Sequence, residues 1–137
     1  YMSIIRAHMI ELIVKLIRVV SDDGKHKKKR ANTEFAISAA IAHIHEHFLQ
    51  GVSLNELSLR FFLSKPHFCK MFKEYTGMTL SEYIHNLRIN EACRLLETTD
   101  MKVVDIGLES GFSDYKSFKN TFRKVKGMLP SEYRESR

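Results

Sequence analysis

Cationic side chains recur at helical spacing in two stretches of the sequence, residues 65–73 and 115–124. The first stretch contains Lys65, Pro66, His67, Cys69, Lys70 and Lys73, and the second contains Tyr115, Lys116, Lys119, Asn120, Arg123 and Lys124. Ammonium and guanidinium groups gathered on one helix face attract the phosphate oxygens of a polyanion. A face that only meets solvent usually mixes both signs of charge. In residues 65–73 and 114–124 the only carboxylate is Asp114, so the pattern favours DNA binding over ordinary surface charge.

A nucleophile with its own base would indicate an enzyme, and the nearest pair is Cys69 with His67. Two residues apart on a helix, these side chains point in different directions, so we expect no catalysis. Cys69 and Cys93 are the only cysteines and form no CxxC motif. We expect no cofactor, and the reducing cytoplasm is the default location.

Three histidines at every second position, His43, His45 and His47, raise the question of a metal site. On a helix only His43 and His47 share a face, and no glutamate or third ligand accompanies them. We expect no metal. Solvated surface histidines are the ordinary interpretation, and a phosphate contact is the alternative.

The two cationic stretches belong to a longer repeat. GMTLSEY at Gly77–Tyr83 returns as GMLPSEY at Gly127–Tyr133, and Phe68 and Phe72 return fifty residues later as phenylalanines. Upstream the offset is forty-nine, and it pairs SLNELSLRFFLS, from residue 53, with KVVDIGLESGFS, from residue 102. The chain therefore contains two copies of one supersecondary unit.

Each unit has the signals of a helix-turn-helix. Ser53 and Glu56 form a capping box before a short apolar stripe, and Ser64 is a plausible N-cap for a second helix with Pro66 in its first turn. Gly111, in the turn of the second unit, can adopt a positive φ without steric cost. A short helix, a tight turn and a second helix that ends at Gly77 are the plan of a DNA-binding motif.

A long helix joins the units. Thr79 and Glu82 form another capping box, and apolar residues follow at helical spacing as far as Leu96. A helix of about 17 residues spans about 25 Å, which together with the half-widths of the units separates the two recognition helices by about one turn of DNA, ~34 Å. Both recognition helices can then enter successive major grooves on the same side of a duplex.

Residues 1–20 predict an amphipathic helix with an apolar seam. The seam consists of Ile5, Met9, Leu12, Leu16 and Val19, and a second strip adds Ile10, Ile13, Ile17 and Val20. Charged residues interrupt the segment too often for a membrane span. Because the chain begins at Tyr1, we expect a further domain upstream. The segment is either a core helix at the end of that domain or a dimerisation helix, and an in-plane membrane anchor is the remotest alternative.

Residues 21–32 contain Gly24 and a run of Lys and Arg, which predicts a basic linker before a domain at 33–137. The linker is either merely solvated, which we favour, or an adjunct that follows DNA phosphates. The whole chain has a net charge of +6 and 44% hydrophobic residues over 137 positions. This composition is typical of one folded, cooperative unit and excludes a disordered chain.

The segment GFSDYKSFKNTFRKVKGMLPSEYR, Gly111–Arg134, resembles the C-terminal signature of the AraC/XylS family of bacterial transcription regulators. The upstream unit matches the first half of that signature, so the resemblance covers roughly Thr33–Arg134. It implies an all-α domain of seven helices, with two helix-turn-helix subdomains and a long connecting helix, that binds promoter DNA and recruits RNA polymerase. Family members commonly have an upstream domain that senses an effector and dimerises, and residues 1–20 look like its last helix. Any effector ligand would then bind that absent domain, and residues 1–20 would join two chains as a homodimer.

The resemblance also implies roles for individual residues. The positions that contact bases are Pro66, Cys69, Lys70, Tyr115, Lys116, Lys119 and Asn120. Phosphate contacts fall on Lys65, His67, Lys73, Arg123 and Lys124. Lys70 and Lys119 would donate to guanine, and Asn120 would pair with adenine.

The sequence departs from the family pattern at two positions of the second unit. Lys102 stands where a Ser or Thr cap is usual, and Gly107 replaces a better helix former, so we expect the first helix of that unit to be less stable. The alternative function is a protein-interaction module that binds an acidic partner. That alternative predicts little salt-linked affinity for DNA, whereas phosphate binding predicts that the affinity for DNA falls steeply with salt.

Overall fold

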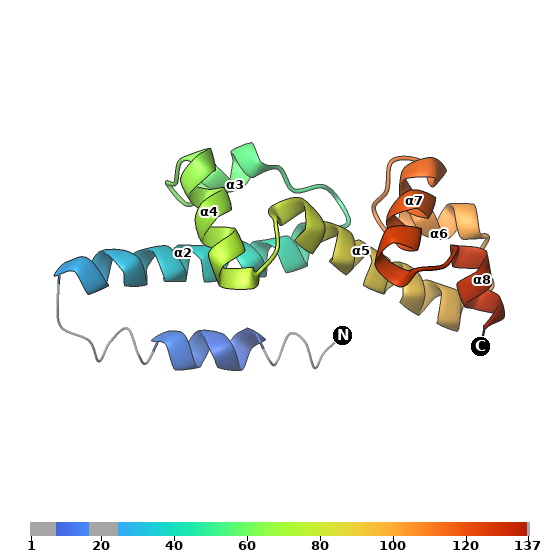
Figure 1. Ribbon diagram of the computed structural model, residues 1–137, viewed down its shortest axis with the longest axis horizontal. Helices are drawn as coiled ribbons and strands as arrows, with labels where there is room; N and C mark the ends of the chain where they lie inside the picture. Colours follow the sequence, from blue (N-terminus) through green and yellow to red (C-terminus); the bar gives the residue numbers. More distant parts are fainter. Residues whose placement is uncertain (1–7, 17–24, 137) are drawn as a thin grey trace.

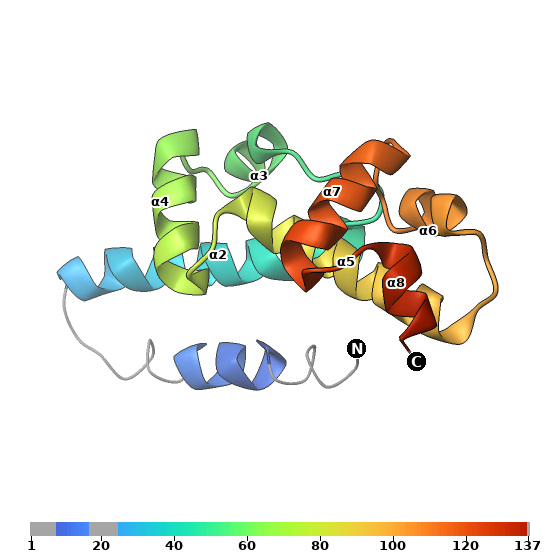
Figure 2. The ribbon, with the colours of Figure 1, turned by 45° about the vertical axis from the view of Figure 1, so that its right-hand side comes forward.

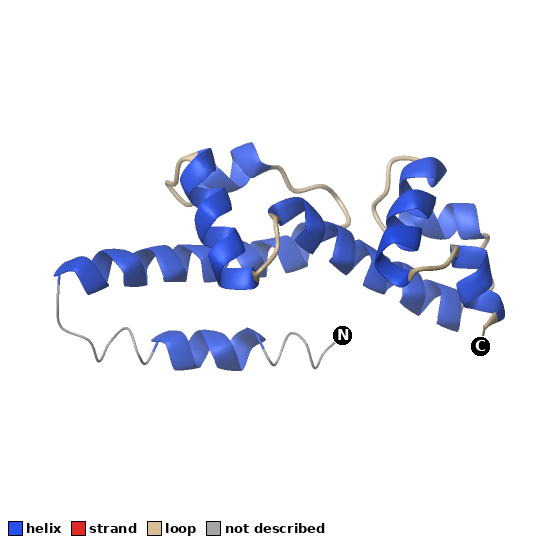
Figure 3. Ribbon diagram, viewed as in Figure 1, coloured by secondary structure: helices blue, strands red, loops and turns tan. Residues whose placement is uncertain are grey.

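The regular structure of the described residues is entirely helical (Figure 3). The computed structural model describes residues 8–16 and 25–136, with the backbone alone for residues 25–28. After a helical segment at 8–16 come α2 (Lys25–His47), α3 (Leu54–Arg60), α4 (Lys65–Thr76), α5 (Leu80–Thr98), α6 (Val103–Glu109), α7 (Tyr115–Lys126) and α8 (Pro130–Glu135). The predicted all-α fold, with two helix-turn-helix units and a long connecting helix, is confirmed.

The first helix-turn-helix unit begins and ends at the residues that the sequence predicts. The Ser53 hydroxyl accepts a hydrogen bond from the Glu56 N–H at 3.0 Å and caps α3, but the Glu56 carboxylate lies 3.2 Å from His43 Nε2, so only this half of the predicted capping box forms. The Ser64 hydroxyl caps α4 in the same way, at 3.3 Å from the N–H three residues later. Gly77 ends α4 in the left-handed conformation, with φ 76°. The two serine caps satisfy N–H groups that the N-terminus of a helix leaves without a partner.

The second unit has the same kinds of cap, except at the N-terminus of α6, where a side-chain cap is missing. The Asp114 carboxylate accepts from the Ser117 N–H at 2.7 Å, and this bond is the main reason why the pKa of Asp114 lies below its usual range. Gly127 ends α7 with φ 74°. Lys102, at the N-cap of α6, provides no side-chain cap, as the sequence indicates.

The turns of the two units share a left-handed residue of different type. Gly111 adopts φ 93°, which confirms the sequence prediction. Phe62 is the equivalent of Gly111 in the first unit, forty-nine residues earlier. It adopts φ 56° although it has a bulky side chain, and that side chain is 95% exposed. This strained phenylalanine could not be predicted from the sequence, because a positive φ is uncommon outside glycine and asparagine.

Each unit has its own apolar core. In the first, Phe68 and Phe72 pack against one face of α2, and in the second Phe118 and Phe122 pack against α5 and Tyr133. The buried face of α2 consists of Ile37, Ala40, Ile41, Ile44 and Phe48. Burial of such side chains contributes about 1.5–3 kcal/mol each. Because the cores are separate, the orientation of one unit against the other depends on α5 and on contacts at the junction.

The connecting helix α5 is bounded by the predicted capping box. The Thr79 hydroxyl accepts from the Glu82 N–H at 3.2 Å, and the Glu82 carboxylate accepts from the Thr79 N–H at 3.0 Å. With 19 residues, α5 is about 28 Å long. Helices α2 and α5 lie along the long axis of the molecule, and α4 and α7 stand on the same side of them and run in the same direction (Figures 1 and 2).

The structure corrects the predicted linker at 21–32. Helix α2 begins at Lys25, so the basic run belongs to this helix. Lys and Arg are good helix formers and no proline interrupts them. Arg30 and Glu34 lie 4.0 Å apart at i,i+4, and the Thr33 hydroxyl donates to the Lys29 carbonyl within the helix. Residues 21–24 of the predicted linker lie outside the described residues.

The N-terminal segment is helical over residues 8–16, within the predicted amphipathic helix. His8 Nε2 lies 3.3 Å from Tyr83 Oη on α5, and Lys15 Nζ lies 3.6 Å from the centre of the Tyr75 ring on α4. Met9, Ile10, Ile13, Val14 and Leu16 remain exposed. Ile5, Ile17, Val19 and Val20 of the predicted seam and second strip lie outside the described residues.

The three neighbouring histidines all differ from the prediction of solvated side chains, and His47 is partly buried with its ring stacked on that of His43. His43 is buried, with Nε2 at 3.2 Å from Glu56 Oε1, so it joins α2 to α3. His45 is half-buried, with Nε2 at 2.8 Å from Tyr83 Oη, and burial followed by the charge of His8 lowers its pKa. Within the described ranges, no three His, Cys, Asp or Glu side chains are close enough to hold a metal ion. No helix there is both long and apolar enough to cross a bilayer.

Candidate nucleic-acid interface

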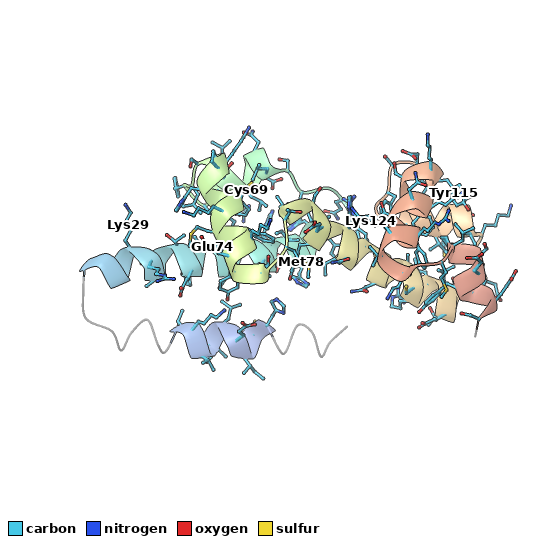
Figure 4. The ribbon with its side chains drawn as sticks, viewed as in Figure 1. Lys29, Cys69, Glu74, Met78, Tyr115 and Lys124 are labelled. Carbon is cyan, nitrogen blue, oxygen red and sulfur yellow. The ribbon has the colours of Figure 1, made fainter. Side chains whose placement is uncertain are left out.

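The predicted contact residues lie on the two helices that stand on the same side of the molecule. Eleven of the twelve are exposed, and only Lys119 is partly buried. Figure 4 marks Cys69 on α4 and Tyr115 and Lys124 on α7. None of the twelve side chains is used in either core. These twelve residues form a surface that we call the cationic face.

The offset of fifty residues gives each helix an equivalent stripe. On α4 the stripe is Pro66, Cys69, Lys70 and Lys73; on α7 it is Lys116, Lys119, Asn120 and Arg123. Residues at i, i+3, i+4 and i+7 share one face of a helix. The phenylalanines at 68, 72, 118 and 122 occupy the opposite, buried face. Because the cores hold both helices by that face, both stripes are turned away from the protein.

The cations of this face have no carboxylate partner. Within residues 8–16 and 29–136, whose side chains are described, no Lys or Arg of the cationic face lies within 4.0 Å of an acidic oxygen, and the ion pairs lie elsewhere. The acid that precedes α7, Asp114, already accepts bonds from the N–H and the hydroxyl of Ser117. Unpaired, exposed cations are available to phosphate oxygens without breaking an internal contact.

Two residues of the cationic face have further contacts. The Tyr115 ring lies 6.3 Å from the Phe118 ring, so it partly covers the second core while it remains 39% exposed. Lys124 lies toward the junction of the units. Burial is the main cause of the low pKa of His85 on α5, and the charges of Arg88 and Lys124 lower it further.

Sequence reasoning missed the polar residues at the junction itself. Arg88 of α5 donates from Nε to the Phe48 carbonyl at 2.8 Å, and the ring of His85 stacks on Phe112 at 6.1 Å. A signal was present, because Arg88 follows buried Ile84 by one helical turn and interrupts an otherwise apolar face.

Comparison with known proteins agrees with this geometry. A protein-family model described as a helix-turn-helix domain matches residues 57–136. The transcriptional activator RhaS of Escherichia fergusonii is 34% identical over 106 residues, which cover 77% of this chain and 38% of that protein. The transcriptional activator AarP of Providencia stuartii is 34% identical over 110 residues, which cover 78% of this chain and 82% of AarP. The chain therefore spans less than half the length of RhaS but most of AarP.

A solved structure has the same fold and contains DNA. The DNA-binding domain of AdpA, a global transcriptional factor, was crystallised in complex with a target DNA. It is 27% identical to this chain, with a TM-score of 0.69 over 74% of this chain and 91% of the AdpA domain. A repeated helix-turn-helix fold, a family model that covers more than half of the chain and relatives of this identity lead to one conclusion: the chain belongs to the AraC/XylS family of helix-turn-helix transcription regulators.

Proposed function

We propose that this protein regulates transcription by placing α4 and α7 in successive major-groove segments on one side of promoter DNA. The observation that carries the proposal is the pair of equivalent, exposed stripes without carboxylate partners, on two helices that run in the same direction (Figures 1 and 2). An α-helix fits the major groove, and two helices about one DNA turn apart meet the same side of the duplex. Promoter DNA in a bacterium lies in the cytoplasm, where we place the protein.

Base recognition falls mainly on the second unit. Asn120 has the amide that pairs with the N6 and N7 of adenine, and Lys119 and Lys70 have ammonium groups that donate to guanine. Cys69 and Pro66 offer small apolar surfaces, which suit contact with a thymine methyl group rather than hydrogen bonding. Lys116 and Tyr115 complete the base-contacting set. Because α7 has more hydrogen-bonding groups, we expect it to discriminate sequence more strongly than α4.

The remaining cations position the protein on the duplex. Lys65, His67, Lys73, Arg123 and Lys124 flank the stripes, where phosphate oxygens line the groove. Contacts to phosphate fix register and orientation but do not specify sequence. Each neutralised phosphate steepens the fall of affinity with salt.

Two further parts of the proposal concern the partners of the protein. RhaS and AarP are described as transcriptional activators, so we expect activation through contact with RNA polymerase once the protein is bound at a promoter. The exposed apolar residues of segment 8–16 are the surface that we assign to a homodimer contact within residues 1–20. An effector, if the protein has one, would act through a domain outside this chain.

Fluorescence anisotropy with a labelled duplex tests the function. The duplex comes from selection of bound sequences out of a random pool, and affinity is measured from low to physiological salt. Lys70→Gln together with Arg123→Gln removes two cations from the cationic face. Lys29→Gln together with Arg30→Gln, on the exposed part of α2 (Figure 4), removes two elsewhere.

We expect the double substitution at Lys70 and Arg123 to weaken binding at least tenfold. The slope of log affinity against log salt should fall by an amount that corresponds to up to about two phosphate contacts. We expect the second pair to change affinity less than threefold. Failure of the protein to bind any duplex at low salt would refute the proposal. Binding to an acidic protein in place of DNA would favour the protein-interaction alternative.

A further inference from the structure

Arg88 of α5 contacts both helix-turn-helix units at once. Its Nε donates a hydrogen bond to the Phe48 carbonyl, at the end of α2, over 2.8 Å. Its guanidinium carbon lies 5.9 Å from the centre of the Phe112 ring, in the turn between α6 and α7. Phe48 belongs to the first core and Phe112 to the second. One side chain therefore bridges two otherwise separate cores.

The turn between α6 and α7 packs closely against the Arg88 side chain. A Cβ placed on Gly111 would lie 3.0 Å from Arg88 Nε and 3.1 Å from the Leu49 carbonyl oxygen. On the other side the His85 ring stacks on Phe112, with 24° between the ring planes. Three segments thus meet at one point: the chain that leaves α2, the middle of α5 and the turn before α7. A residue larger than glycine at position 111 would crowd its neighbours there.

The first unit shows that a helix-turn-helix turn does not itself need such a contact. Phe62 occupies the position equivalent to Gly111, and its side chain is 95% exposed. The first turn is therefore open to solvent, while the second is packed against the neighbouring unit. The Arg88 contact serves the junction between the units and not the folding of either turn.

We propose that Arg88 is a positioning residue that sets the spacing between α4 and α7, and hence the distance between half-sites that the protein accepts on DNA. The proposal rests on the proposed function. A planar guanidinium donates in its plane and stacks on an aromatic ring by its face, and lysine cannot do both. With Arg88 in place the second unit is held at one orientation. Without it, α5 is the main connection between the separate cores, and the second unit can shift relative to the first when α5 bends between its two packed halves.

A spacing series on DNA measures this effect. Duplexes contain the selected site with one or two base pairs inserted between its half-sites, and further duplexes contain a single half-site. Each added base pair moves one half-site by about 3.4 Å and by about 35° around the axis. Arg88→Met removes the donors and the charge but keeps a long side chain. Arg94→Met makes the same change on an exposed position of the same helix and is the matched control.

For the wild-type protein and for Arg94→Met we expect at least a tenfold loss of affinity on insertion of two base pairs. For Arg88→Met we expect that loss to shrink to threefold or less, with affinity for the single half-site unchanged within twofold. Arg88→Lys, which keeps the charge but cannot stack in the same way, should behave like Arg88→Met. A spacing penalty of equal size in the wild type and in Arg88→Met would overturn the role of Arg88.

A second measurement needs no DNA. Spin labels on Cys69 in α4 and on Glu109→Cys at the end of α6, with buried Cys93→Ala, report the distance between the units. We expect one narrow distance distribution, which broadens when Arg88→Met is added. An unchanged distribution would also refute the positioning role. A wild-type protein that binds no DNA would refute the proposed function instead, and this distance measurement would still decide whether Arg88 fixes the units.

Discussion

At the scale of single residues, Asn120 is the sharpest candidate for base recognition. Its side chain is exposed in the middle of α7, on the stripe opposite buried Phe118 and Phe122. A carboxamide both donates and accepts, so it can form two hydrogen bonds with adenine. The neighbouring Lys119 is partly buried and only donates. Discrimination at one base position should therefore depend on Asn120 more than on any other single side chain.

Asn120→Ala should relax the preference at one base pair of the selected site. A bidentate pair provides about 1–3 kcal/mol of discrimination, so we expect the preference at that position to fall by roughly 5- to 150-fold. Competition with duplexes that vary one position at a time measures it. A uniform loss of affinity for every duplex would show instead that Asn120 contacts phosphate.

The backbone conformation of Phe62 destabilises the folded state. A bulky residue in the left-handed region costs about 1–2 kcal/mol, and its exposed ring returns little burial energy. Phe62→Gly should therefore raise the free energy of unfolding by about 0.5–1 kcal/mol, after the added entropy of glycine in the unfolded chain. Urea denaturation measures this change. Phe62→Ala keeps the strained φ and serves as the control, and equal stabilisation by both variants would contradict the argument.

At the scale of elements, the contact between α6 and α7 requires a small residue. The sequence indicated Gly107 as a poor helix former that weakens α6. In the structure it is buried against α7, and a Cβ there would lie 2.7 Å from Cδ1 of Phe118. The equivalent residue in the first unit, Ser58, is also small and buried. Close approach of the two helices, and not helix propensity, explains the glycine.

Gly107→Ala should consequently destabilise the protein. Alanine gains about 1 kcal/mol in helix propensity, but forcing a methyl group against Phe118 costs about 1–3 kcal/mol. We expect the midpoint of thermal unfolding to fall by a few degrees. Ser58→Ala, at the matched position where a Cβ is already accommodated, should change it less. An increase in stability of Gly107→Ala would show that propensity outweighs packing here.

Most helices could be predicted from the sequence because their signals are local. The start of a helix is indicated by capping residues such as Ser53, Ser64 and Thr79, and its end by a left-handed glycine such as Gly77. The start of α2 could not be placed, because a run of Lys and Arg fits a solvated linker as well as an exposed helical turn. The fifty-residue repeat also predicted both cationic stripes, since periodicity alone decides which residues share a face.

Contacts between distant elements could not be predicted in the same way. The partners of His43, His45 and Arg88 lie on other helices or beyond a turn. Pairing of this kind depends on how the helices pack, which a single sequence does not state. The prediction of solvated histidines was therefore wrong, and the apolar face predicted for α5 did not indicate that Arg88 joins the two units, while the elements that contain these residues were right.

At the scale of the whole molecule, the N-terminal segment raises the question of assembly. Residues 8–16 contact α4 and α5 through Lys15 and His8, yet Ile10 and Ile13 are each more than half exposed. Exposed apolar residues on one helix commonly mark a protein interface. The polar contacts orient the segment against the DNA-binding units, and its exposed apolar residues form the surface proposed for the homodimer contact.

Ile10→Glu together with Ile13→Glu should abolish a homodimer formed through this segment. Two buried charges without partners cost several kcal/mol, which raises the dissociation constant at least a hundredfold. Sedimentation velocity measures the change from dimer to monomer, and Glu11→Gln on the same segment is the control. An unchanged sedimentation coefficient, or a wild-type protein that is already monomeric, would refute dimerisation through residues 1–20.

In the proposed function, two cationic helices held by α5 bind one side of a single duplex. Hydroxyl-radical footprinting of the wild-type protein on its selected duplex measures this arrangement. We predict two protected segments whose centres lie about ten base pairs apart on the same face of the DNA. A single protected segment, or two segments on opposite faces, would contradict the arrangement of α4 and α7 described here.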